Sequence, residues 1–138
     1  PSHILVSRRR DTNIWLGGNI EYTIKDGSDG LVLIAENNNL IVSNSPNDLF
    51  LDGVYVAQKG KFGRNHYTGQ AMKKNKLTIF GSVVSNGRVG TKWTCNGLFC
   101  SGYKDRETNY DSKLSSNPPP FLLPTSEEYE FKEWEEVE

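Results

Sequence analysis

The chain has 138 residues, of which 36% are hydrophobic and 24% are charged, and its formal net charge is −1. This length and composition indicate one folded domain with enough apolar side chains for a core. The near-neutral balance points to neither nucleic acid nor an anionic membrane as a partner of the whole chain. No run of about 18 apolar residues occurs, so the sequence predicts no membrane-spanning helix.

Short strand-like runs, separated by Gly and Asn, recur from residue 13 to residue 87, and helical periodicity is scarce. Several runs are apolar on consecutive positions, as strands buried on both faces are. The sequence therefore predicts an all-β domain. The runs are NIWLGG, NIEYTI, GLVLIAE, NLIVS, LFLDG, GVYVAQ, KLTIFG and GSVVSNG.

The runs also repeat. Segments 49–63 and 77–90 share an apolar alternation that ends in Gly, then a Val-containing strand and a Gly turn, and segment 30–42 matches the second half of this unit. Aligning Gly30, Gly53 and Gly81 gives spacings of 23 and 28 residues, and an exposed loop insertion at 64–76 accounts for the longer one.

Such a repeat is typical of a right-handed parallel β-solenoid (β-helix), with Gly and Asn at corners where φ is positive. The irregular repeat lengths leave a β-sandwich as the alternative fold. We expect one domain over 1–138, with an N-terminal coil or cap at 1–28, solenoid coils at 29–103, and a C-terminal extension and cap at 104–138. The side chains expected to point inward are Leu31, Leu33, Leu49, Leu51, Val54, Val56, Leu77, Ile79 and Val83.

The two cysteines, Cys95 and Cys100, have a C-x4-C spacing with an Asn-Gly turn between them. A disulfide fits this loop and would indicate an exported protein, whereas two free buried thiols are the alternative. A zinc site is disfavoured because it normally has four ligands and only His3 and His66 remain to complete it.

The loop at 61–76 interleaves basic and aromatic side chains, a combination that binds single-stranded nucleic acid or acidic glycans. A solvated loop without a ligand is the alternative interpretation. The candidate ligand-binding residues are Lys61, Arg64, His66, Tyr67, Lys73, Lys74 and Lys76.

Catalysis is not expected. Carbohydrate-active β-helix enzymes use clustered carboxylates, but Glu21, Glu36 and Asp52 fall at different places in the proposed coil. His66 is a lone loop histidine with no recognisable partner, and DGSDG at 26–30 has the pattern of a turn rather than a calcium loop. We therefore expect no enzymatic activity, no cofactor and no metal.

The C-terminal segment 117–138, NPPPFLLPTSEEYEFKEWEEVE, has the properties of a solenoid cap. Open solenoid ends expose strand edges and an apolar cross-section, so they need covering. The prolines enforce an extended path that does not pair, and the following aromatics alternate with glutamates. The cap residues are Pro118, Pro119, Pro120, Phe121, Tyr129, Phe131 and Trp134.

The same C-terminal stretch resembles the signature of bacterial PilX-type, type IV pilus-associated surface proteins. Segments DGLVLIAENN, LDGVYVAQKG, LTIFGSVVSNGRVGT and SGYKDRETNYD also look like that family, so the resemblance spans about residues 29–138. The signature carries no catalytic residues. Its matching positions are Tyr110, Asp111, Leu114, Asn117, Pro118, Pro119, Pro120, Phe121, Pro124 and Trp134.

The resemblance implies a pilin-like protein, with an apolar N-terminal helix that anchors it and a β-rich domain displayed outside the cell. The chain starts at Pro1 without an initiator Met, so we expect further residues upstream. This chain would be the extracellular, cell-surface domain, acting without catalysis in pilus assembly, adhesion or surface display. Its expected partners are other pilin or pilus-associated subunits, and a surface glycan or DNA through the basic loop. Membrane contact would come only through the helix that this chain lacks.

Two alternatives belong to other functional classes. One is a carbohydrate-binding or carbohydrate-active β-helix protein, which would have convergent carboxylates in an outward cleft. The other is an intracellular polymerising scaffold with reduced cysteines and uncapped ends, against which the proline-rich segment argues.

Overall fold

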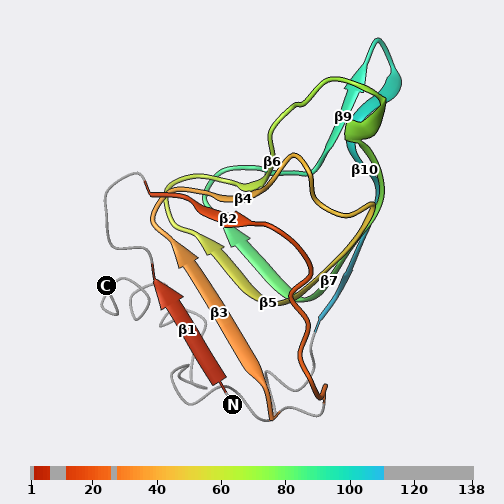
Figure 1. Cartoon of the computed structure of the whole chain (residues 1–138). Coiled ribbons are helices and arrows are strands. Elements are labelled where there is room, and N and C mark those ends of the chain that lie inside the picture. Colours follow the sequence, from red (N-terminus) through yellow and green to blue (C-terminus); the bar gives the residue numbers. More distant parts are fainter. Residues whose placement is uncertain (1, 7–11, 26–27, 111–138) are drawn as a thin grey trace.

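The computed structural model describes residues 2–6, 12–25 and 28–110 (Figure 1). In this part of the chain the elements are strands and one short 3-10 turn, so the all-β prediction is confirmed. The elements are β1 (Ser2–Val6), β2 (Ile14–Leu16), β3 (Gly30–Ala35), β4 (Asn39–Ile41), β5 (Asp48–Ala57), β6 (Phe62–Arg64), η1 (Gln70–Met72), β7 (Lys73–Ser85), β8 (Val89–Gly90), β9 (Lys92–Cys95) and β10 (Leu98–Asn109).

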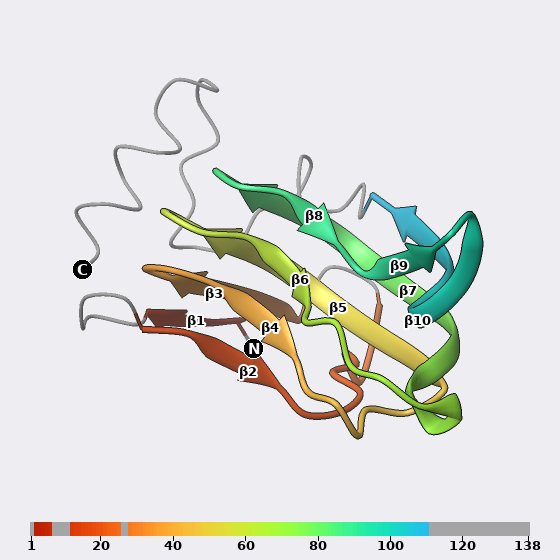
Figure 2. The same cartoon turned by 90° about the horizontal axis from the view of Figure 1, so that it is seen from above.

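The strands alternate between two sheets as the chain coils. One sheet has the order β1-β3-β5-β7-β10-β9 and the other has the order β2-β4-β6-β8. Neighbouring strands are parallel except for the β9–β10 pair, and Figure 2 shows successive coils stacked side by side in both sheets. The predicted parallel β-solenoid is therefore confirmed, and the β-sandwich is excluded because consecutive strands pair with the next coil rather than with each other.

The register between coils corrects the alignment made from the glycines. Gly53 pairs with Gly81, as predicted, at an offset of 28 residues. Val32 pairs with Val54, however, an offset of 22 residues rather than the expected 23. This one-residue difference places Leu31, and not Gly30, opposite Gly53.

A one-residue change of register moves a side chain to the other face of a sheet. The inward prediction for Val54 and Val56 is therefore wrong, since both belong to a cluster separate from the interior one. The predictions for the other seven residues are confirmed, because all seven lie in or against the interior cluster. That cluster consists of Leu16, Leu33, Ile41, Leu49, Leu51, Tyr55, Phe62, Leu77, Ile79 and Tyr103, with Ile14, Ile20, Leu31 and Val83 packed against it.

The outer face of the longer sheet carries a second apolar layer. Val32, Ile34, Val54 and Val56 are each at most 4% exposed. Partly buried side chains from β1 and β7 pack against them. Both faces of β3 and β5 are therefore buried, which explains why their sequences are apolar on consecutive positions.

Strands occur both in the segment expected as an N-terminal coil or cap and in the segment expected as a C-terminal extension. Residues 1–28 include strands β1 and β2, which pair with β3 and β4 to form a first coil. At the other end β10 continues to Asn109, into the segment 104–138 expected as the C-terminal extension. The predicted cap residues Pro118, Pro119, Pro120, Phe121, Tyr129, Phe131 and Trp134 lie outside the described residues.

Asparagine corners work through side-chain hydrogen bonds rather than through positive φ. Asn38 donates from its backbone N and Nδ2 to Asn13 Oδ1 at 3.2 and 2.9 Å, and its Oδ1 accepts from Lys61 N at 2.8 Å. Among the described residues only Asn96 is a non-glycine with positive φ. The corner asparagines therefore tie three coils together at one edge.

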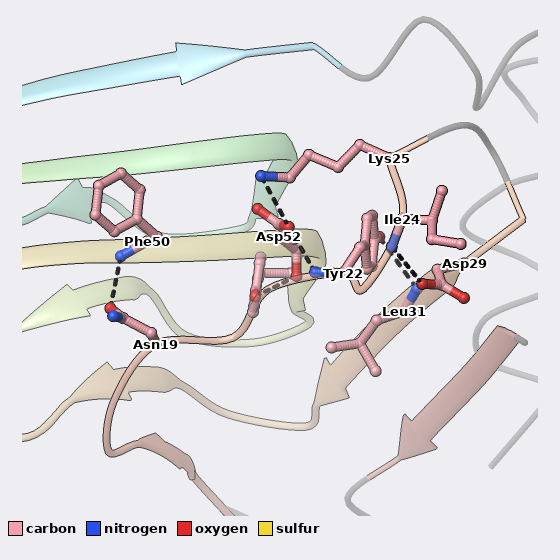
Figure 3. Close-up of polar contacts among 9 residues, drawn as sticks. Asn19, Tyr22, Ile24, Lys25, Asp29, Leu31, Phe50 and Asp52 are labelled. Carbon is pink, nitrogen blue, oxygen red and sulfur yellow. Dashed lines mark hydrogen bonds and ion pairs between the residues drawn. The ribbon is translucent and has the colours of Figure 1, made fainter.

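A further connection fastens the segment after β2 onto β5 (Figure 3). Tyr22 N donates to Asp52 Oδ2 at 2.7 Å, Lys25 Nζ lies 3.5 Å from the same oxygen, and Phe50 N donates to Asn19 Oδ1 at 3.0 Å. Asp52 is only 2% exposed. A buried carboxylate is costly unless it has hydrogen-bond and charge partners, and these contacts supply them.

The glycine corner between Gly53 and Gly81 generates a first prediction. Gly81 has a φ of 142°, and a Cβ added there would overlap the Gly53 carbonyl oxygen. We expect Gly81→Ala to lower the free energy of unfolding by about 1–3 kcal/mol, the usual range for backbone strain, or by more because of the overlap. Gly90→Ala is the matched control, because a Cβ at Gly90 meets no atom within 4 Å. Equal denaturant midpoints for the two variants would contradict this role for the corner.

A second prediction concerns Tyr55, which is fully buried and donates its hydroxyl to the Asp52 carbonyl at 2.7 Å. Burial raises the pKa of Tyr55 far above its ordinary value. Above a pH of about 10 the unfolded chain therefore releases a proton that the folded chain keeps, and the free energy of unfolding falls by up to about 1.4 kcal/mol per pH unit.

Denaturant unfolding between pH 9 and pH 11 measures this slope. Tyr55→Phe should flatten it, whereas Tyr110→Phe, which alters a side chain that is 60% exposed, should leave it as in the wild type. Parallel slopes for the wild type and Tyr55→Phe would overturn the assignment.

Candidate functional site

One corner of the solenoid projects beyond the stacked coils. Figure 1 shows that the β9–β10 hairpin and the connection from β6 to β7 extend together from this corner. Most of the predicted ligand-binding residues lie in this region, but they do not form one exposed basic loop. The connection is also shorter than the predicted insertion at 64–76, since Lys73–Lys76 already belong to β7.

Arg64 lies inside the fold and is 0% exposed. Its Nη2 donates to the Ser43 carbonyl at 2.9 Å, and its guanidinium lies 5.0 Å from the centre of the Tyr67 ring. Burial lowers the pKa of Arg64, while the Tyr103 and Tyr67 hydroxyls act in the opposite direction. These contacts make Arg64 a structural residue that holds the β6–β7 connection against the coils, and not a surface ligand group.

The three lysines of β7 have different environments. Lys73 is exposed, whereas Lys74 is half-buried. Burial lowers the pKa of Lys74, and the positive charge of Arg64 lowers it further. Lys76 Nζ pairs with Glu107 Oε1 at 3.1 Å. Only part of this basic run is therefore available to an anionic ligand.

A cavity of about 330 Å³ lies where β8 and β9 face β10. Its lining includes three cationic residues, Lys92, Lys104 and Arg106, together with the buried Tyr103. Tyr103 is fixed there because its hydroxyl donates to the Pro46 carbonyl at 2.6 Å. Three cationic residues in the lining of one cavity give it a positive character that favours an anion.

Sequence reasoning named none of these three cations as a ligand-binding residue. Lys104 and Arg106 stand in the stretch KDRE, where alternating charge suggests a solvated strand. The sequence did contain one indication of the pair: Lys104 and Arg106 are two positions apart, and residues with that spacing lie on the same face of a strand.

The hairpin tip brings the cysteines and a histidine together. Cys95 and Cys100 form a disulfide with a Cα–Cα distance of 5.7 Å. His66 Nε2 lies 3.9 Å from Cys95 Sγ and 3.8 Å from Cys100 Sγ. The His66 ring also contacts the Trp93 ring edge-on, with centroids 5.2 Å apart. His66 is therefore not a lone loop histidine, as the sequence had suggested.

Two of the three carboxylates considered in the sequence, Glu36 and Asp52, have structural partners. Glu36 Oε1 accepts from Lys59 Nζ at 2.8 Å, and Asp52 binds the Tyr22 backbone and Lys25 as described above. Each side chain thus has a structural partner, and they lie on different strands or turns.

Comparison with known proteins identifies no relative: no protein-family model, no curated protein and no solved structure matches the chain. Over residues 2–6, 12–25 and 28–110, no helix has the length and apolar character needed to cross a membrane.

The buried guanidinium of Arg64 generates a third prediction. Arg64→Met removes the donor to the Ser43 carbonyl and should lower the free energy of unfolding by about 1–3 kcal/mol. Lys73→Met, at an exposed position nine residues away, should change it by less than about 0.5 kcal/mol. Thermal or denaturant unfolding of both variants tests this, and a neutral Arg64→Met would mean that the guanidinium is a surface group after all.

Proposed function

We propose that this chain is the displayed, non-catalytic β-solenoid domain of a pilin-like bacterial surface protein, acting in type IV pilus assembly, adhesion or surface display. The resemblance of segment 29–138 to PilX-type proteins supports this proposal. So does the Cys95–Cys100 disulfide, because disulfides persist mainly in exported proteins.

The observation that carries the proposal is the projecting corner. The stacked coils form a rigid support, and the β6–β7 connection and the β9–β10 hairpin stand beyond them (Figure 1). Binding residues are often placed on loops that a rigid scaffold positions. A displayed binding domain has this division between support and recognition surface.

The chemistry of the cavity favours an anionic ligand. Lys92, Lys104 and Arg106 line it. A surface polysaccharide with carboxylate or sulfate groups, or DNA, offers anionic groups in a repeating polymer. The cavity therefore replaces the loop at 61–76 as the centre of the proposed recognition surface.

A fourth prediction compares two triple variants that remove the same charge. Changing Lys92, Lys104 and Arg106 to Gln should weaken binding to an acidic polysaccharide or to DNA at least tenfold. For DNA, the slope of log K against log salt concentration should become shallower by up to about three, about one for each phosphate contact removed. Changing Lys73, Lys74 and Lys76 to Gln should have a smaller effect, since Lys74 is half-buried and Lys76 is paired. Binding measured at two salt concentrations separates the variants.

Three outcomes would count against the proposal. Equal losses of affinity in the two triple variants would indicate general electrostatic attraction rather than a binding site at the cavity. Absence of binding by the wild type to either polymer would remove the anionic ligand. The natural full-length protein tests the pilus assignment itself: a cleaved secretory signal without an apolar anchoring helix would refute it and bring the carbohydrate-active alternative forward.

A further inference from the structure

Three potential metal-ligating atoms converge at the tip of the projecting corner. His66 Nε2, Cys95 Sγ and Cys100 Sγ all lie within 4.8 Å of one another. They come from the connection after β6 and from two strands of the hairpin, 29 and 34 residues further along the chain. His66 and Cys95 are exposed and Cys100 is half-buried, so the group is open to solutes.

The distances suit a tetrahedral metal. Zn–S bonds of about 2.3 Å and Zn–N bonds of about 2.0 Å place sulfur and nitrogen ligands about 3.5 Å apart in a tetrahedral site. The two S···N distances here are 3.9 and 3.8 Å. Once the S–S bond is broken, the sulfurs need to separate by less than about 2 Å to take up such positions.

The hairpin does not depend on the disulfide for its shape. β9 and β10 pair in antiparallel register from Cys95 and Leu98 to Lys92 and Gly102. Asn96 and Gly97 both have positive φ, as a two-residue hairpin turn requires. Reduction therefore leaves the two cysteines on neighbouring strands, close enough to share one ligand.

His66 is also held independently of the sulfurs. On one side of it, the Arg64 carbonyl accepts from Trp93 Nε1 at 3.0 Å. On the other, the Tyr67 carbonyl accepts from Ser101 Oγ at 2.6 Å. Both donors belong to the hairpin, so the backbone around His66 remains attached to it when the disulfide opens.

We propose that the hairpin is a redox-gated metal site: in its reduced form it binds one Zn²⁺ through His66 Nε2, Cys95 Sγ and Cys100 Sγ. Two thiol groups of a reductant transfer two electrons to the Cys95–Cys100 disulfide. The products are two cysteine thiols and the disulfide form of the reductant. Zn²⁺ then displaces the two thiol protons. Three protein ligands leave a fourth coordination position for water or an external donor, an arrangement found in open zinc sites. The inference does not depend on the proposed function.

The disulfide and the metal are mutually exclusive states of the same three residues. In the oxidised chain the sulfurs are bonded to each other and offer no thiolate, so Zn²⁺ has only the imidazole. In the reduced chain a bound Zn²⁺ withdraws both thiolates from reoxidation. The sequence argued against zinc because four ligands were sought, whereas the folded corner assembles three.

The fifth prediction is tested on the full chain after mild reduction, with Zn²⁺ in competition against a chromogenic chelator and Co²⁺ as a spectroscopic probe. We expect one metal per chain, a thiolate-to-cobalt charge-transfer band, and release of about two protons per Zn²⁺ at neutral pH. The oxidised chain should bind at least a hundredfold more weakly.

His66→Ala should also weaken Zn²⁺ binding at least tenfold and change the Co²⁺ spectrum, while His3→Ala, at an exposed position on β1, serves as the matched control. Cys95→Ser with Cys100→Ser should abolish the charge-transfer band. Circular dichroism of each variant establishes that the solenoid is retained. The proposal is overturned if the reduced chain fails to bind Zn²⁺, if the oxidised chain binds it equally well, or if His66→Ala binds it as the wild type does.

Discussion

Parallel stacking of β5 on β7 is the constraint on which the rest of the structure depends. The two strands pair over ten consecutive positions, from Asp48 with Lys76 to Ala57 with Ser85. This register places Leu49 beside Leu77 and Leu51 beside Ile79 in the interior, and it superimposes the two corner glycines. Because each coil buries its apolar side chains only against its neighbours, the position of every loop follows from this stacking.

The same stacking separates the coils, which support the structure, from the projecting segments that carry the candidate site. Among the described residues, the interior hydrophobic cluster carries polar atoms only on Tyr55 and Tyr103, whose hydroxyls donate to backbone carbonyls. The three potential metal-ligating side chains lie where the chain leaves the coils, in the β6–β7 connection and in the β9–β10 hairpin. Arg64 joins the two regions, since its backbone ends β6 while its side chain anchors the connection.

The fold class was predictable because stacked coils leave two marks in the sequence: a repeated unit of short strands, and runs of consecutive apolar residues. The register was not, because corner glycines can be aligned one residue out of step without any visible penalty in the sequence. The start of β7 was missed because KKNK has no apolar alternation, although its strand pairs with β10. The cavity and the His66–cysteine group depend on contacts between distant segments, which one sequence does not reveal.

The β9–β10 edge limits how the solenoid can be extended. A parallel coil exposes backbone donors and acceptors on which another chain can add, and repeated addition would build a filament. Here antiparallel β9 covers the edge of β10 from Leu98 to Gly102, so an incoming parallel strand meets the wrong hydrogen-bond pattern. Beyond that point β10 presents the alternating charges Lys104, Asp105, Arg106 and Glu107, a second deterrent to edge pairing. Along this edge, antiparallel pairing and alternating charge both oppose the addition of a further parallel strand.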